Sequence, residues 1–125
     1  MFNVQIDQTK SLIRELLNHH NLNNWKIGWS KAFPKGAAYT DFIQKTIRFN
    51  VYYILANSKK EIIDTVLHEI AHALVGRKHK HGNVWKAKYI EIGGSGKEYM
   101  TYSSTGKTLA FYAFNRDKVR GKVNE

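Results

Sequence analysis

The first part of the chain combines one stretch of helical spacing with short stretches of alternating polar and apolar residues. From residue 7 to about residue 21 the apolar side chains fall at helical intervals, and Asp7 or Thr9 is available as the N-cap. Three strand-like segments follow, at residues 25–29, 36–39 and 47–51. This order predicts one helix followed by a small three-stranded sheet.

Ser58 and Glu61 mark the start of the main helix. A serine followed three residues later by a glutamate is a capping box, in which each side chain satisfies a free backbone N–H. Gly76 stands where a left-handed residue commonly ends a helix. Between these points runs a wide apolar stripe formed by Ile62, Ile63, Val66, Leu67, Ile70 and Leu74. The pattern predicts a helix that packs on a core along one face.

A third helix is predicted over about residues 82–92. Trp85, Tyr89 and Ile92 share one side of it and are expected to be buried. Residues 93–96, which are three glycines and a serine, end this helix and predict a flexible connector.

The remaining chain predicts one further element and a tail. Residues 99–114 are expected to form a β-hairpin that turns at Thr105-Gly106. The complete pattern predicts an α+β fold, with one domain over residues 1–114 and a basic C-terminal tail at residues 115–125.

Composition narrows the chemistry that the chain can perform. It has no cysteine, which excludes disulfides, a thiol nucleophile and cysteine-ligated zinc, so any metal must be held by histidine and carboxylate. No stretch approaches the roughly 18 apolar residues of a membrane span, and the start lacks the pattern of a secretory signal. We therefore expect a cytoplasmic protein that does not enter a membrane.

The net charge adds a candidate partner. Twenty Lys and Arg against ten Asp and Glu give a formal charge of +10 and a pI near 9.8. Such a field attracts polyanions, and nucleic acid is the natural one. The alternative, a protein that is merely basic, is equally compatible with composition.

A metal-binding pattern lies in the middle of the main helix. His68 and His72 are four residues apart, so a helix presents both imidazoles to one point in space, which suits tetrahedral zinc. Glu69 follows the first histidine, where its carboxylate can reach a metal-bound water as the general base of a zinc hydrolase. The alternatives are a chance match and two solvated histidines. The apolar stripe beside the motif favours the metal site.

A catalytic zinc usually has a third protein ligand. The downstream candidates are His79, His81, Glu91 and Glu98. The metzincin pattern requires glycine and histidine where this chain has Val75 and Lys78, so that family is excluded. Spacing alone does not choose among the four candidates.

Two runs resemble the metalloprotease core of the SprT-like family, to which the Spartan DNA–protein crosslink proteases belong. They are His-Glu-Ile-Ala-His-Ala-Leu-Val-Gly at residues 68–76 and His-Gly-Asn-Val-Trp-Lys at residues 81–86. The order of one helix, three strands and the motif helix is also similar to that family. Bacterial SprT-like proteins often carry a cysteine-ligated zinc ribbon after the core, and this chain has no cysteine to form one.

The resemblance implies a minimal zincin-like core with Zn²⁺ as its cofactor. It implies that His81 is the third ligand beside His68 and His72. Glu69 is then the catalytic base, and Trp85 packs in the following helix.

These inferences together predict a zinc-dependent endopeptidase that acts on protein or peptide substrates, in particular on DNA-associated proteins. Basic residues near the motif are Arg77, Lys78, Lys80, Lys86 and Lys88, and the tail adds four more. They form either a DNA-binding groove or a solvated basic face. One alternative function is a non-catalytic zinc-containing nucleic-acid-binding module, but Glu69 argues against it because a structural site needs no base. Another is a nuclease, for which the clustered carboxylates are missing.

Overall fold

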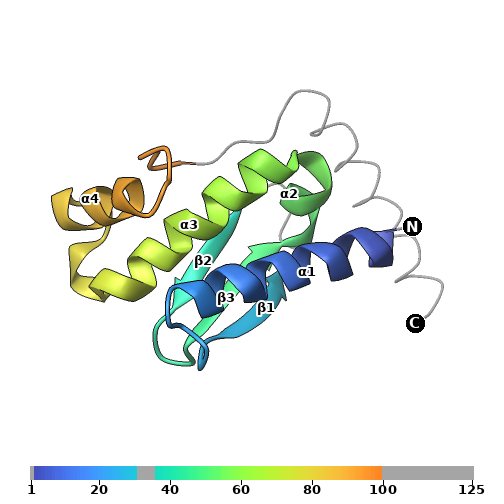
Figure 1. Ribbon diagram of the computed structural model, residues 1–125, viewed down its shortest axis with the longest axis horizontal. Coiled ribbons are helices and arrows are strands. Elements are labelled where there is room, and N and C mark those ends of the chain that lie inside the picture. The colour runs from blue at the N-terminus through green and yellow to red at the C-terminus, as the bar shows by residue number, and fades with distance from the viewer. Residues whose placement is uncertain (1, 31–35, 100–125) are drawn as a thin grey trace.

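The computed structural model describes residues 2–30 and 36–99, and this part of the chain forms an α+β fold (Figure 1). The helices are α1 (Phe2–His19), α2 (Val51–Ala56), α3 (Lys59–Val75) and α4 (Asn83–Glu91), with a short 3-10 helix, η1 (Arg77–His79). The strands are β1 (Lys26–Ser30), β2 (Ala38–Asp41) and β3 (Thr46–Asn50). The predicted order of a helix, three strands, the motif helix and a further helix is confirmed.

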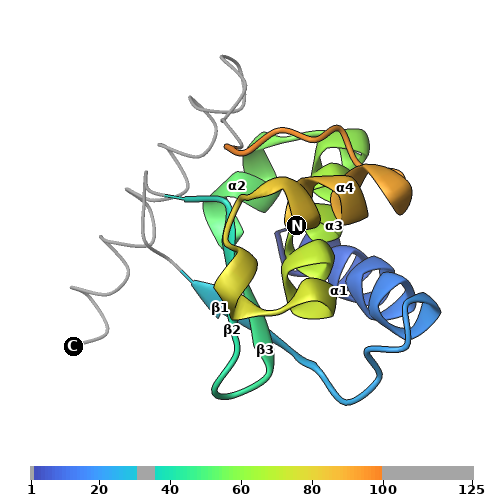
Figure 2. The ribbon, with the colours of Figure 1, turned by 90° about the vertical axis from the view of Figure 1, so that its left-hand side faces the viewer.

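The three strands form one sheet with β3 in the middle. Strand β1 pairs with β3 in parallel, and β2 pairs with β3 antiparallel, so the order across the sheet is β1-β3-β2. The sheet is one layer, and α1 and α3 lie together on one side of it (Figure 2). Among the described strands, β2 is therefore an edge strand, and its neighbour across the layer is α3.

Two groups of buried side chains hold the layers together. The larger one lies between α1, β3 and α3, and its fully buried members include Ile13, Leu17, Ile47, Phe49, Val66 and Ile70. The smaller one joins α3 to α4 through Leu67, Ala71, Trp85 and Tyr89. As predicted, Trp85 and Tyr89 are fully buried, while Ile92 is partly buried. Helix α3 thus packs against α1 and the sheet on one side and against α4 on the other.

The start of α1 differs from the prediction. The helix already begins at Phe2, so neither Asp7 nor Thr9 is its N-cap. Thr9 is only 7% exposed and lies on the same face as Ile6 and Ile13, which pack in the core. The helix therefore begins about one turn before residue 7, where the spacing of apolar residues predicts its start.

The sequence pattern does not predict helix α2, because apolar and polar residues alternate over residues 47–51 as they do in a single strand. Asn50 ends the strand by capping the helix: its side-chain oxygen accepts the N–H of Tyr52 at 2.9 Å. Its side-chain amide donates to the Gly36 carbonyl at 3.2 Å. Asn50 thus ends β3 and starts α2. The spacing of apolar residues does not reveal this change, because the residue that caps the helix is polar.

Helix α3 starts and ends where predicted, but only one half of the predicted capping box forms, because the Glu61 carboxylate accepts the Ser58 hydroxyl and not the Ser58 N–H. The Ser58 hydroxyl oxygen accepts the N–H of Glu61 at 3.4 Å, and its O–H donates to the Glu61 carboxylate at 3.0 Å. The helix stops at Val75, where the N–H of Gly76, with φ 97°, donates to the His72 carbonyl. The predicted hairpin, beyond Tyr99, and the basic tail lie outside the described residues. Within residues 2–30 and 36–99, no helix is both long and apolar enough to cross a membrane.

Candidate active site

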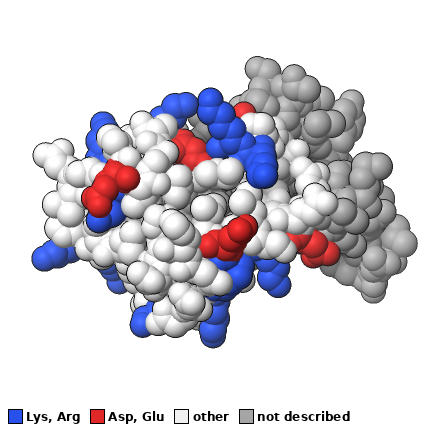
Figure 3. Space-filling model, viewed as in Figure 1, with Lys and Arg blue, Asp and Glu red and all other residues white. Residues whose placement is uncertain are grey.

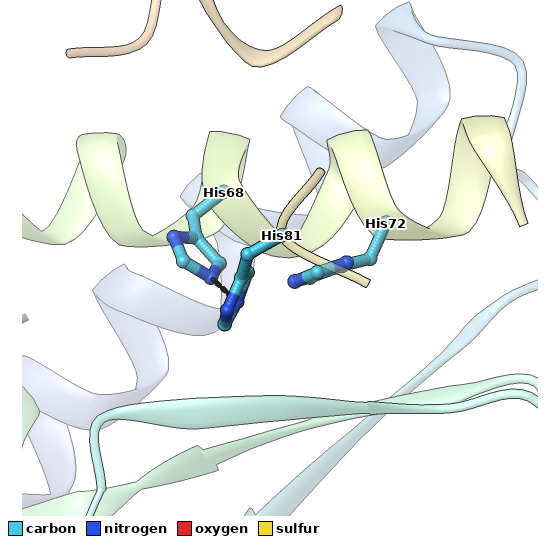
Figure 4. Close-up of side chains that lie close together, drawn as sticks. All are labelled: His68, His72 and His81. Atoms are coloured by element: carbon cyan, nitrogen blue, oxygen red, sulfur yellow. Dashed lines mark hydrogen bonds between the residues drawn. The ribbon is translucent and has the colours of Figure 1, made fainter. Parts of the chain in front are cut away.

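Three imidazoles converge below one side of α3. His68 and His72 project from the helix, and His81 reaches the same space from the turn before α4 (Figure 4). The candidate ligand atoms of these three side chains lie within 4.8 Å of one another. Nε2 of His68 and Nε2 of His81 are 3.3 Å apart. In a tetrahedral site with Zn–N distances of about 2.0–2.1 Å, two nitrogens are separated by about 3.3 Å. The spacing of His68 and His81 therefore matches that of two ligands on one zinc ion, and the three imidazoles together could hold a metal ion.

A strained turn brings His81 back to α3. Lys80 has φ 45° and ψ −128°, a conformation that residues with a side chain rarely adopt. The Gly82 N–H then donates to the His79 carbonyl at 2.8 Å, and a Cβ at Gly82 would stand 3.0 Å from that oxygen. A side chain after His81 would therefore crowd this carbonyl, and glycine leaves room for the turn to close.

Trp85 packs against all three imidazoles. Its ring lies parallel to that of His72, with centroids 5.0 Å apart, and its centroid is 4.7 Å from that of His68 and 4.6 Å from that of His81. Its Nε1–H donates to the His68 carbonyl at 3.1 Å. Trp85 is fully buried, so it fixes α4 to α3 at the point where the first imidazole leaves the helix.

His68 and His72 are held in their neutral form. Burial, together with repulsion from the neighbouring histidines, lowers the pKa of both His68 and His72 to about 4. Near pH 7 both rings are then uncharged, which is the form that binds a metal.

Glu69 lies against the cluster on its sheet side. Its side chain is almost completely buried, and burial raises the pKa of its carboxyl group to about 7. The Thr40 hydroxyl, on β2, donates to Oε1 of Glu69 at 2.9 Å, which opposes that rise. The second oxygen, Oε2, is 3.8 Å from Nε2 of His68. One oxygen is thus anchored to the sheet while the other faces the imidazoles.

These side chains line an open cleft of about 380 Å³. Strand β2 forms one wall through Ala38, Tyr39 and Thr40, and α3 forms the other. Arg77 and Lys80 stand at the cleft and are exposed, together with the acidic Glu98, so two basic groups and one acidic group flank the approach to the imidazoles.

A sequence model of the SprT-like family matches residues 6–105 of the chain. This chain belongs to the SprT-like family. The resemblance carried by residues 68–76 and 81–86 is therefore confirmed. No curated protein matches the sequence of this SprT-like chain.

The fold of the SprT-like chain is similar to a solved metallopeptidase. The crystal structure of the metallopeptidase zymogen jannalysin from Methanocaldococcus jannaschii aligns with a TM-score of 0.56. The alignment covers 87% of this chain and 95% of that chain, with 19% sequence identity. The likeness shows that the two proteins share a fold.

The structure brings together some of the predicted site residues of this SprT-like chain and separates others. His68, Glu69, His72 and His81 meet at one cleft, as the resemblance implies. Of the other third-ligand candidates, Glu91 pairs with Lys88 at 3.1 Å on an exposed surface. His79 and Glu98 are not members of the histidine cluster, although Glu98 lines the cleft.

Two site features carried no sequence signal. Thr40 is 29 residues from Glu69, and only the position of β2 against α3 brings them together. The Lys97 carbonyl accepts a hydrogen bond from Nδ1 of His68 at 3.2 Å, and a main-chain oxygen has no residue-type signature. The connector at residues 93–96, predicted to be flexible, is instead hydrogen-bonded to α3 through Ser95.

Proposed function

We propose that this chain is a zinc-dependent endopeptidase. Its metal ligands are His68, His72 and His81, and Glu69 is its general base. The observation that carries the proposal is the placement of a buried carboxyl group, with a pKa of about 7, beside three converging imidazoles. A site that only stabilised the fold would need the ligands but not this carboxyl group.

Zinc bound at this site supplies Lewis acidity and a water of lowered pKa. Oε2 of Glu69 is free of hydrogen bonds to the sheet and accepts the proton of the attacking water. The same carboxyl group then donates that proton to the leaving amine, as general acid–base catalysis requires. Thr40 holds Oε1 throughout, so the carboxyl group keeps one orientation for both transfers.

The proposed substrate is a polypeptide in an extended conformation. Asn50 donates its N–H to the Ala37 carbonyl at 2.8 Å, so Ala37 belongs to a hydrogen-bonded pair of the β2–β3 ladder. Because such pairs alternate, the backbone groups of Ala38 and Thr40 point away from β3. Among the described strands nothing pairs with that edge, and it lines the cleft. An added strand of substrate fits there.

We further propose that the substrates are DNA-associated proteins. This rests on the formal charge of +10 and on the resemblance to the Spartan-type core. Arg77, Lys78, Lys80 and Lys86 are exposed, and Arg77 and Lys80 line the cleft, whereas Lys88 is partly buried and paired with Glu91. On the face in Figure 3 the basic groups stand at several separate places among acidic ones. Binding to DNA is therefore expected to be electrostatic and without base readout.

The test of the protease proposal is Glu69→Gln, which keeps the size of the side chain but removes its carboxylate. The zinc-loaded variant should cleave an unfolded basic protein at least 10²- to 10⁴-fold more slowly than the natural chain. Its zinc content should stay at the natural level. Glu91→Gln removes a carboxylate from the exposed side of α4 and serves as the matched control, with activity unchanged. Undiminished cleavage by Glu69→Gln would exclude Glu69 as the base.

The test of the DNA proposal is a salt titration of binding to single-stranded DNA. Affinity should fall steeply as salt rises, because Lys and Arg release counterions from the phosphates. Glu69→Gln should bind DNA as tightly as the natural chain, which separates binding from chemistry. If neither protein binds DNA at low salt, the substrate proposal fails while the protease proposal stands.

A further inference from the structure

His68 is held through its second ring nitrogen. Nδ1 of His68 lies 3.2 Å from the Lys97 carbonyl oxygen. A carbonyl can only accept, so Nδ1 carries the proton and donates it. Nε2 of the same ring is then the lone-pair nitrogen, and it faces Nε2 of His81 at 3.3 Å. The Lys97 carbonyl therefore selects the tautomer that can bind a metal through Nε2.

The Lys97 carbonyl belongs to a segment that has no helix or strand of its own. Residues 95–98 follow the end of α4, and Lys97 is exposed. The position of this carbonyl must therefore come from contacts that the segment makes with the rest of the molecule. Because the carbonyl is a backbone group, no side-chain substitution removes it directly.

Asp64 makes those contacts, one turn before His68 on α3. Its Oδ1 accepts the N–H of Ser95 at 2.8 Å, and its Oδ2 accepts the Ser95 hydroxyl at 2.7 Å. Oδ1 also accepts the Tyr89 hydroxyl at 2.7 Å. The Ser95 hydroxyl oxygen in turn lies 3.3 Å from the N–H of Lys97, which donates to it. A continuous chain of hydrogen bonds thus runs from Asp64 to the residue whose carbonyl holds His68.

The glycines beside Ser95 are required for this contact. Gly93 and Gly96 have φ values of 105° and 85°, which favour glycine. A Cβ at Gly94 would stand 1.9 Å from ring atoms of Tyr89. The connector is therefore fitted closely against α4, and its path toward Lys97 is defined by packing as well as by Asp64.

We propose that Asp64 is a positioning residue for the metal ligand His68, and that it acts through Ser95 and the Lys97 carbonyl. Both carboxylate oxygens of Asp64 accept hydrogen bonds from Ser95 and Tyr89, so the hydrogen-bonded route from Asp64 to the imidazole runs through the connector, beside a weaker effect of its charge on His68. This inference rests on the proposed zinc site. Loss of such an outer hydrogen-bond partner typically weakens metal binding 10- to 100-fold.

The test measures the dissociation constant for Zn²⁺ by competition with a chromophoric chelator, in the whole 125-residue chain shown to be folded without metal. Asp64→Ala removes the anchor, and Zn²⁺ should bind 10- to 100-fold more weakly. Asp64→Asn keeps an oxygen for the Ser95 N–H and an amide that can donate to the hydroxyl. Because Asp64 acts by holding the connector in place, the dissociation constant of this conservative variant for Zn²⁺ should stay within about threefold of that of the natural chain.

Thr65→Val is the matched control. Thr65 is the next residue on α3, is fully buried and donates to the Tyr53 hydroxyl at 2.9 Å, away from the connector. The substitution should lower stability but leave Zn²⁺ affinity unchanged, which separates positioning from a general loss of stability.

A second readout is the tautomer of His68 in the metal-free protein, measured by ¹⁵N NMR of the imidazole. The proton should lie on Nδ1 in the natural chain and in Asp64→Asn, and should be distributed over both nitrogens in Asp64→Ala. If Asp64→Ala does not fold, Ser95→Ala decides, with Zn²⁺ binding several-fold weaker. Unchanged Zn²⁺ affinity in folded Asp64→Ala or Ser95→Ala would overturn the inference. Failure of the natural chain to bind Zn²⁺ would instead overturn the proposed function.

Discussion

Helix α3 carries two carboxylates five residues apart that lie in opposite surroundings. Asp64 faces the connector and accepts three donors, the Tyr89 hydroxyl and the N–H and hydroxyl of Ser95. Burial alone raises its pKa, but these hydrogen bonds outweigh burial and the pKa is lowered. Glu69 faces β2 and accepts one hydroxyl, from Thr40, so burial dominates and its pKa is raised to about 7.

The difference shows how one helix provides both an anchor and a base. A carboxylate with a full set of donors stays charged and holds its partners in place. A buried carboxyl group with one donor lies close to its protonation midpoint at neutral pH, which suits a group that must accept and return a proton. The number of donors around each carboxylate, and not its position on the helix, separates these roles.

The contrast between Glu69 and Asp64 should have its largest effect on the pH dependence of stability of the metal-free protein. The pKa of Glu69 is raised from 4.5 to about 7, so the folded state binds this proton more tightly than the unfolded state. The stabilisation is complete below pH 4.5 and is lost as pH rises through about 7. Between pH 4 and 8, the free energy of unfolding of the natural chain should fall by on the order of 3 kcal/mol relative to that of Glu69→Gln, as measured by chemical unfolding. Parallel pH profiles for the two proteins would mean that burial does not raise this pKa.

A smaller effect is expected when the single donor to Glu69 is removed. Thr40→Val keeps the shape of the side chain but loses the hydroxyl that orients Oε1. The turnover number should fall roughly tenfold while KM stays nearly constant, because the base is displaced and the cleft is not. Thr40→Ser restores the donor and should recover most of the activity. Equal activity of the valine and serine variants would contradict an orienting role for Thr40.

The smallest effect is expected for Asp64, in the stability of the protein at acidic pH. The lowered pKa of Asp64 means that its stabilisation is present above its unfolded pKa and is lost as pH falls through the lower, folded pKa. The stability difference between the natural chain and Asp64→Asn should therefore shrink below about pH 4, and the change should be small because water screens this partly exposed group. A difference that grows toward low pH would show that Asp64 is not the charged partner of Ser95.

The elements that the sequence predicts correctly depend on local patterns. The cap of α3 by Ser58 and the helical spacing of His68 and His72 involve residues about one turn apart, so their geometry follows from the helix alone. The N-cap of α1 and the whole of α2 were wrong or missed, because Thr9 turns into the core and Asn50 caps a helix where the apolar alternation still indicates a strand.

The parts of the site that could not be predicted depend on tertiary contacts. Spacing left four candidates for the third ligand, because the turn that returns His81 to α3 depends on the unusual backbone of Lys80. Thr40 reaches Glu69 only because β2 is antiparallel at the edge of the sheet. Ser95 reaches Asp64 across 31 residues, and nothing in a glycine-rich run indicates such a partner.

The most direct test of the three-histidine site is the zinc content and zinc affinity of two single variants. His81→Ala removes a member of the cluster, whereas His79→Ala removes a histidine two residues away that is not part of it. The natural chain and His79→Ala should each bind about one Zn²⁺ per chain with equal affinity, and His81→Ala should bind it far more weakly. Full Zn²⁺ affinity in His81→Ala, with loss of affinity in His79→Ala, would contradict the site described here.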